Sequence, residues 1–301
     1  MSSIQSDLGN FSQALIALVN QTAHGVVAVK SAAYRVTSGV VLANNLVAVT
    51  SHSLRREDRI PVHAGDGAEA GATVLGRDPG LDLAILRTEG LNPQVLPAAD
   101  PSTLKAGMLA AVVGRTVDVG PTVSLGVLGA VGPSRKNWRG GTLDQFLRLD
   151  VNVYPSQSGA AVVNTEGQLI GMATPALSRH STLAIPMASI ERIARELLEQ
   201  GRILHGYLGV GAQPVAVAKM NTAQETGLIL LSVEADSPAE KAGLLLGDVL
   251  LTLDGKPMAD IDDLHAALRG DVVGKSVKAA VLRGGKLVET EILVLERGAR
   301  K

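Results

Sequence analysis

The chain contains no cysteine among its 301 residues. Disulfide frameworks, thiol nucleophiles and cysteine-ligated metal sites are therefore excluded. Aromatic residues make up only 2% of the chain, whereas glycine occurs 33 times. Short runs of valine, leucine, alanine and glycine dominate instead. Such a composition favours many short strands joined by tight turns, as in β-barrels and β-sandwiches.

An excess of charge of either sign is also missing. Twenty-eight basic residues face 29 acidic ones, for a formal net charge of −1. Phosphate binding needs clustered lysine and arginine, so no nucleic-acid partner is expected. The short basic cluster of Arg135, Lys136 and Arg139 is interpreted as a solvated loop. The histidines other than His52 show no metal-ligand spacing and are interpreted as surface or structural residues.

Long apolar runs are absent as well. No run approaches the ~18 residues needed to span a bilayer, so no membrane partner is expected. Residues 1–9 are polar and acidic and lack the basic start and apolar block of a secretory signal. The chain as written is therefore expected in the cytoplasm, and in the periplasm if a leader is missing.

The pattern along the chain predicts three parts. Residues 8–20 place Phe11, Leu15 and Leu18 at helical spacing, which predicts an N-terminal helical segment over residues 1–24. Short apolar runs, punctuated by Gly, Asn, Asp and Pro every 8–12 residues, then favour a β-barrel domain, closed by a helix at its end, over residues 25–202. A smaller unit of strands around two helical segments is predicted over residues 206–297.

Three polar residues lie at the edges of apolar runs. His52 follows LVAVT (46–50), Asp82 opens DLAILR (82–87), and Ser158 lies in YPSQSGAAVVN (154–164). A serine hydroxyl becomes a nucleophile when an imidazole accepts its proton and a buried carboxylate holds that imidazole. A His, an Asp and a Ser in this order occur by chance in most chains. From order alone, a surface histidine, a turn aspartate and a turn serine remain the alternative.

The surrounding sequence resembles the HtrA family of trypsin-like proteases. The resemblance rests on TSGVVLANNLVAVTSHSL (37–54), the segment ending in DLAILR, TVSLGVLGAV (122–131) and LDVNVYPSQSGAAVVNTEGQLIGMAT (149–174), and it covers nearly the whole chain. It implies a mainly β protein, with a chymotrypsin-like double six-stranded β-barrel followed by an α+β PDZ domain.

The resemblance also assigns roles to residues of this chain. His52 matches the general base, Asp82 the orienting acid and Ser158 the nucleophile, while the backbone N–H groups of Ser156 and Ser158 match the oxyanion-hole donors. The specificity pocket is expected to include Val153, Tyr154 and parts of 174–184. No metal and no organic cofactor is implied. The family commonly trimerises through its N-terminal segment, which implies a homotrimer with Phe11 as a contact candidate.

A second resemblance concerns the smaller unit. Tyr207, Leu208, Gly209 and Val210 resemble the carboxylate-binding loop of PDZ domains, and SPAEKAGLLLGDVLLTLDGKPM (237–258) resembles the segment that follows it in the HtrA family. Such a loop offers backbone N–H groups to the terminal carboxylate of a peptide, which adds a strand to an exposed sheet edge. The implied ligands are hydrophobic peptide C-termini. Without the downstream match, YLGV would be an ordinary strand start.

Departures from the family pattern leave the function open. Ser156 replaces the family's glycine two residues before the nucleophile, Ala160 and Ala161 replace glycine and proline, and the connection into His52 is about one residue shorter. The first hypothesis is a serine endopeptidase that degrades unfolded or damaged proteins. The alternative is a proteolytically inactive, peptide-binding chaperone or scaffold. A third possibility is a protease that stays inactive until a peptide on the PDZ domain orders its oxyanion loop.

Overall fold

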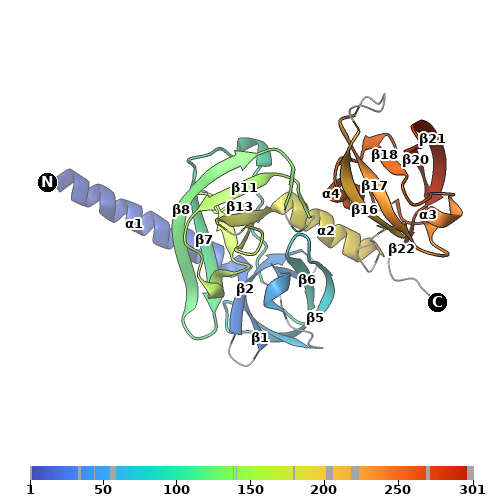
Figure 1. Ribbon diagram of the computed structural model, residues 1–301. Coiled ribbons are helices and arrows are strands. Elements are labelled where there is room, and N and C mark those ends of the chain that lie inside the picture. Colours follow the sequence, from blue (N-terminus) through green and yellow to red (C-terminus); the bar gives the residue numbers. More distant parts are fainter. Residues whose placement is uncertain are drawn as a thin grey trace. The chain divides into compact units, whose positions relative to one another are not determined.

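The computed structural model divides into two compact units, Met1–Arg202 and Ile203–Lys301 (Figure 1). It describes residues 2–32, 35–43, 45–54, 59–91, 93–137, 139, 141–178, 180–200, 206–217, 224–268 and 272–296. The expected boundary residues 202 and 297 lie outside this description, so the exact domain limits remain predictions. No helix among the described residues combines the length and the apolar character needed to cross a membrane.

The first unit begins with a long helix. Helix α1 spans Ser2–Thr22 and is followed by the short 3₁₀ turn η1, Ala23–Gly25. Three of its apolar side chains are exposed to solvent: Leu8 at 65%, Phe11 at 48% and Ile16 at 49%. The helix therefore carries apolar side chains that its own unit leaves uncovered.

Six strands then close the first barrel. They are β1 (Val26–Ala32), β2 (Arg35–Leu42), β3 (Leu46–Thr50), β4 (Ile60–His63), β5 (Glu69–Asp78) and β6 (Leu83–Thr88), in the order β1-β2-β3-β6-β5-β4. Their inward side chains are almost all aliphatic, among them Val29, Val49 and Leu86. Gly39 suits this interior, because a Cβ there would lie 2.7 Å from Val47 and 2.9 Å from Val49.

A second closed barrel follows. Its strands are β7 (Leu109–Thr116), β8 (Gly120–Gly132), β11 (Phe146–Asp150), β12 (Ala161–Val163), β13 (Leu169–Thr174) and β14 (Thr182–Pro186), in the order β11-β14-β13-β12-β7-β8. The hairpin of β9 (Arg135–Lys136) and β10 (Thr142–Leu143) connects β8 to β11, the turn η3 (Pro101–Thr103) precedes β7, and helix α2 (Met187–Gln200) follows β14. The predicted pair of six-stranded barrels is confirmed.

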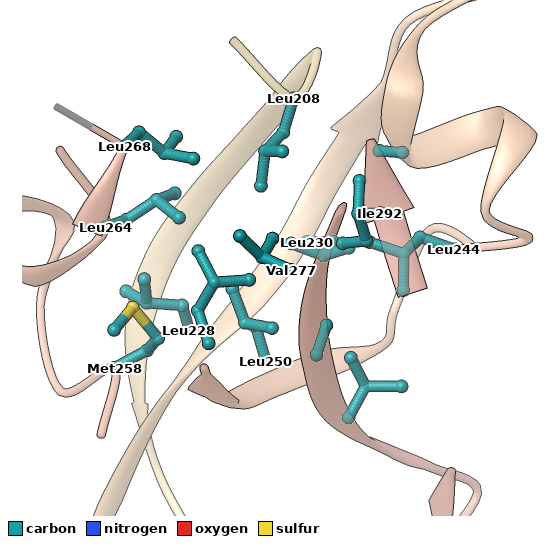
Figure 2. Close-up of a cluster of buried hydrophobic side chains, with 14 of the residues drawn as sticks. Leu208, Leu228, Leu230, Leu244, Leu250, Met258, Leu264, Leu268, Val277 and Ile292 are labelled. Atoms are coloured by element: carbon teal, nitrogen blue, oxygen red, sulfur yellow. The ribbon is translucent and has the colours of Figure 1, made fainter. Parts of the chain in front are cut away.

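The second unit is a small α+β domain. Its strands are β15 (Gly206–Tyr207), β16 (Val210–Ala216), β17 (Thr226–Val233), β18 (Val249–Leu253), β19 (Lys256–Pro257), β20 (Ser276–Arg283), β21 (Lys286–Leu293) and β22 (Leu295–Glu296), and its helices are α3 (Pro238–Lys241) and α4 (Ile261–Ala267). The main sheet runs β16-β17-β18-β20-β21. Figure 2 shows its aliphatic core, in which Leu228, Leu230, Leu250, Val277 and Ile292 meet.

Local contacts explain two features of this domain. The Ser237 side chain accepts a hydrogen bond from the N–H of Glu240, and Pro238 occupies the first helical position, so that α3 starts here. Asp248 turns the chain into β18 and binds the Arg283 guanidinium at 2.7 Å. Burial raises the pKa of the Asp248 carboxyl, but the hydrogen bonds from Arg283 and from the N–H of Leu245 outweigh burial, so the net pKa is lowered.

Candidate active site

The structure brings His52 and Asp82 together at one end of the first barrel. His52 lies in the 3₁₀ turn η2 (Ser51–Ser53), directly after β3, and Asp82 directly precedes β6. Because β3 pairs with β6, with Thr50 opposite Leu83, the two side chains meet. His52 Nδ1 lies 2.8 Å from Asp82 Oδ2 and 3.0 Å from Oδ1. A carboxylate in this position keeps the proton on Nδ1 and leaves the Nε2 lone pair facing outward.

Asp82 is built into the protein interior. Its side chain is fully buried and also accepts hydrogen bonds from the backbone N–H of His52 at 3.0 Å and from the Thr174 hydroxyl at 2.6 Å. Its φ of 54° lies in the left-handed region, which costs a non-glycine residue on the order of 1 kcal/mol and is often found at functional sites. Thr174 was missed by the sequence reasoning, because only the fold brings β13 to Asp82.

Ser158 lies within reach of His52, and two further hydroxyls surround it. Ser158 Oγ is 3.4 Å from His52 Nε2 and 3.0 Å from Thr50 Oγ1. Thr50 Oγ1 is 2.6 Å from Ser53 Oγ, which in turn lies 3.5 Å from His52 Nε2. The single proton of the Ser158 hydroxyl therefore has two possible acceptors. Catalytic hydrogen bonds are often long in the absence of substrate and tighten when it binds.

The backbone around Ser158 is anchored to β2. The Ser158 carbonyl accepts hydrogen bonds from the Ser38 N–H at 3.0 Å and from the Thr37 hydroxyl. Gly159 has φ of 82°, and a Cβ on it would lie 2.2 Å from the Ser38 carbonyl oxygen. Only glycine fits this approach, which explains the Ser-Gly pair.

In the loop that carries Ser156 and Ser158, which we call the oxyanion loop, one of the two expected N–H donors is already hydrogen-bonded. Residues Pro155–Gln157 form the 3₁₀ turn η4, and the Ser158 N–H donates to the Pro155 carbonyl at 3.2 Å. Ser156 is not among the described residues with positive φ. The two N–H groups of Ser156 and Ser158 therefore do not converge on a free site in this state, because Pro155 occupies the second. Their role as a pair of oxyanion donors remains a prediction.

Hydrogen bonds hold the residues on either side of the peptide bond between Pro155 and Ser156. The Ser38 hydroxyl accepts from the Arg115 N–H at 3.0 Å and donates to the Ser156 carbonyl at 2.8 Å. The buried Gln157 side chain accepts from the Tyr154 N–H at 3.1 Å and from the Ser124 hydroxyl at 3.0 Å. Rotation of the single peptide between Pro155 and Ser156 would free the Ser158 N–H without breaking these bonds. That rotation moves the φ of Ser156 towards positive values, which glycine tolerates and serine resists.

A cleft of about 840 Å³ borders strands β8, β11 and β14 of the second barrel. Its lining includes Asp150, Val151, Asn152, Pro175, Ser178, His180, Ser181 and Thr182. Pro175 directly follows Thr174, which contacts Asp82. Val153 packs, half-buried, against the core of the second barrel, and Tyr154 is 60% exposed. Neither residue lines this cleft, so their place in the specificity pocket remains a prediction. Of the expected segment 174–184, Pro175, Ser178, His180, Ser181 and Thr182 do line it.

The predicted carboxylate loop lies between β15 and β16. Gly209 has φ of 80°, and a Cβ there would lie 2.2 Å from the Ser237 Cβ. The Leu208 carbonyl accepts from the Ala239 N–H at 2.9 Å, and the Gly209 carbonyl accepts from the Glu234 N–H at 2.8 Å. The carbonyls of the loop are thus bound to the protein. Within the described part of the chain, the N–H groups of Leu208 and Gly209 have no partner.

The next strand offers an edge for a peptide. Strand β16 is the last strand on its side of the main sheet and pairs with β17. Leu208 faces Leu264 of α4 and Leu268 just beyond it, as Figure 2 shows. A backbone edge, unpaired N–H groups and an apolar floor are the three elements that a PDZ-type site needs.

Comparisons with known proteins agree with this architecture. A family model described as a trypsin-like peptidase domain matches residues 37–172, and one described as a PDZ domain matches residues 206–294. The chain is 31% identical over 267 residues to the periplasmic pH-dependent serine endoprotease DegQ of Escherichia coli, covering 85% of this chain and 56% of that protein. It is 30% identical over 268 residues to the periplasmic serine endoprotease DegP of Salmonella typhimurium, with the same coverage of both chains.

Solved structures are similar over almost the whole chain. The serine endoprotease from Yersinia pestis matches with a TM-score of 0.75 at 26% identity, covering 93% of this chain and 97% of that one. The HtrA-type protease AlgW with a tripeptide also matches with a TM-score of 0.75 at 26% identity, covering 94% and 97%. The chain spans about half the length of the curated relatives it matches, 56% in the two named above.

Proposed function

We propose, from the premise that the chain belongs to the HtrA family of trypsin-like serine proteases with a PDZ domain, that it is a serine endopeptidase. Its proposed substrates are unfolded or damaged polypeptides. The observation that carries the proposal is the contact of His52 with buried Asp82 on one side, at 2.8 Å, and with Ser158 on the other, at 3.4 Å. Its direct test is labelling by a fluorophosphonate probe, which reacts with an activated serine.

The mechanism follows from these contacts. Ser158 Oγ attacks the carbonyl carbon of the scissile peptide while its proton passes to His52 Nε2. Asp82 stabilises the resulting imidazolium and holds the ring in place, and Thr174 orients the carboxylate. His52 then gives the proton to the leaving amine, and water hydrolyses the acyl-enzyme by the same route. Oxyanion stabilisation requires the Ser158 N–H, which commonly supplies a large share of the rate enhancement.

We infer that the conformation described is a resting one. The hydrogen bond between the Ser158 N–H and the Pro155 carbonyl removes one oxyanion donor, and loss of such a donor costs about 10²- to 10³-fold in rate. Peptide binding that favours the rotated peptide would restore it. A chain that never rotates this peptide would be the inactive, peptide-binding scaffold. The two functions therefore differ at Ser156, because its φ becomes positive in the active protease and stays negative in the scaffold.

Ser156→Gly is expected to raise the rate of fluorophosphonate labelling roughly five- to tenfold. Glycine adopts positive φ without the cost of about 1 kcal/mol that serine bears, and 1.4 kcal/mol is a factor of ten. The second-order labelling rate of variant and parent measures the effect. Ser156→Ala is the matched control, since it removes the hydroxyl but keeps the Cβ, and no gain is expected from it. An inert parent that becomes strongly active as Ser156→Gly would favour the scaffold as the natural function.

We further propose that the second unit binds hydrophobic peptide C-termini through Leu208, Gly209 and Val210. The support is the pair of unpartnered N–H groups beside an apolar floor, together with the likeness to a protease solved with a tripeptide. A decapeptide ending in a free carboxylate is expected to bind at least tenfold more tightly than the same peptide with a C-terminal amide. Hydrogen bonds to a charged group contribute about 1.5–3 kcal/mol. Fluorescence anisotropy with both peptides tests this, and equal affinities would contradict it.

Assembly and location form a third part of the proposal. We propose a homotrimer in which Leu8, Phe11 and Ile16 of α1 are covered, because exposed apolar side chains on one helix favour association. We propose the periplasm as the compartment, because the relatives are named as periplasmic proteases. The cytoplasmic location expected from the N-terminal residues finds no support in these relatives.

A further inference from the structure

A second hollow in the first unit, of about 410 Å³, adjoins the cleft of the second barrel. Its lining residues lie on or beside β9 and β10, at the start of β11, and between β13 and β14 or in β14: Arg135, Lys136, Asn137, Leu143, Phe146, Leu177, Ser178, His180, Ser181 and Leu183. We refer to it as the basic pocket. The sequence suggested only a solvated loop for Arg135 and Lys136, whereas the fold places both on the wall of a cavity.

The charge of the basic pocket has one sign. Among the residues that the structure describes, Arg135, Lys136 and His180 are the ionisable ones that line it, and no described aspartate or glutamate does. The neighbouring carboxylate, Asp144, is already bound by the Arg192 guanidinium at 3.1 Å and by the Ser189 hydroxyl at 2.7 Å. The pocket therefore presents positive charge that this carboxylate does not neutralise.

The shape and stiffness of the pocket favour a particular ligand. The Arg135 guanidinium lies 5.2 Å from the centroid of the Phe146 ring, a cation–π contact that holds an otherwise mobile side chain at the wall. Leu143, Leu177 and Leu183 contribute apolar surface. The Ser178 and Ser181 hydroxyls are hydrogen-bonded to each other at 3.0 Å, so this pair has one proton left to donate to a ligand. A carboxylate at the end of a short aliphatic stem matches both parts, since guanidinium binds carboxylate strongly and the stem packs on leucine.

The basic pocket is continuous with the substrate cleft. Ser178, His180 and Ser181 line both hollows. Pro175 also lines the cleft, and it directly follows Thr174, whose hydroxyl donates to Asp82. A polypeptide that extends from the triad along this cleft would bring a nearby side chain to the basic pocket.

We propose that the basic pocket is a subsite for an acidic side chain, preferably glutamate, of the polypeptide substrate. The inference rests on the proposed endopeptidase function and adds a substrate class to it. A glutamate placed in the pocket is expected to raise kcat/KM roughly five- to tenfold over glutamine, and this preference weakens as salt rises because the charges are partly exposed.

The test uses peptides that differ only in charge. A set of C-terminally amidated peptides, which the PDZ-type loop binds poorly, carries glutamate or glutamine at one position at a time around the cleavage site. Cleavage by the full chain gives kcat/KM, and anisotropy with the full-length Ser158→Ala protein gives affinity without turnover. One position is expected to prefer glutamate five- to tenfold in both measurements. The double variant Arg135→Ala/Lys136→Ala, whose residues line the basic pocket and are not among the residues lining the cleft, is expected to lose this preference and to leave the glutamine peptide unchanged.

The control variant is Arg87→Ala, which removes an exposed arginine on β6 of the other barrel and is expected to keep the preference. Equal binding and cleavage of glutamate and glutamine peptides at every position would overturn the subsite and leave the endopeptidase standing. A preference that survives in the double variant would overturn its location. If no peptide is cleaved by the parent or by its Ser156→Gly variant, the endopeptidase proposal fails, and the affinities measured with Ser158→Ala still decide for or against the subsite.

Discussion

Ser158→Ala is expected to abolish fluorophosphonate labelling and to lower kcat for peptide hydrolysis by about 10⁶-fold, the scale found when a triad nucleophile is removed. The reason is that no other group in the triad can form the acyl-enzyme: His52 is held by Asp82 at 2.8 Å and serves as the base. Ser158 is buried, and alanine fits there because it differs from serine only by loss of the hydroxyl. Mass spectrometry of the labelled protein and a peptide-hydrolysis assay measure the loss.

The matched control is Ser53→Ala. The Ser53 hydroxyl lies 3.5 Å from His52 Nε2, almost as close as the 3.4 Å of Ser158, so the two variants ask which hydroxyl the base activates. Labelling is expected to persist in Ser53→Ala. The opposite pattern, with label retained in Ser158→Ala and lost in Ser53→Ala, would assign the reactive serine to η2. If the parent is inert, the same comparison in the Ser156→Gly background decides the question.

Asp82→Asn is expected to lower kcat by about 10⁴-fold while leaving the fold intact. An asparagine amide no longer requires the proton on His52 Nδ1, so Nε2 loses the lone pair that accepts the Ser158 proton. The backbone tolerates the change, because asparagine adopts positive φ more readily than most residues and Asp82 has φ of 54°. Steady-state hydrolysis measures kcat, and a thermal melt reports on folding.

A matched carboxylate serves as the control for Asp82. Asp100 caps the exposed turn η3 by accepting the Ser102 N–H at 2.9 Å, and asparagine caps equally well, so Asp100→Asn is expected to keep full activity. A loss of less than tenfold in Asp82→Asn, in a protein that melts normally, would contradict the proposed role of Asp82.

Much of the architecture was readable from local sequence. Short aliphatic runs separated by glycine, asparagine and proline every 8–12 residues predicted β-barrels, since inward side chains of a small barrel must be compact. The start of α3 is likewise set locally, because the capping hydroxyl of Ser237 and the fixed φ of Pro238 act within one turn. The positions of His52, Asp82 and Ser158 were likewise accessible, because each borders an apolar run and matches a family motif.

Other features depend on contacts that sequence spacing does not encode. Thr174 meets Asp82 across 92 positions of the chain, and the second hydroxyl near Ser158, that of Thr50, is 108 positions away. Arg135 and His180 reach one pocket only because the hairpin after β8 and the segment before β14 come together. The first two proximities arise because the two barrels pack against each other, and the third arises from the pairing of β11 with β14 in the second barrel.

The sequence by itself determined the two-unit β architecture, the three residues proposed as the triad and the departure from the family pattern at Ser156, because these follow from hydrophobic periodicity, turn chemistry and motif. Only the tertiary structure decided that the Ser158 N–H is bound to the Pro155 carbonyl at 3.2 Å and that basic residues of a loop line a cavity. The physical reason is that these features depend on small energies and on residues far apart in the sequence. The orientation of a single peptide depends on an energy of about 1 kcal/mol, and a cavity depends on segments that only the fold brings together.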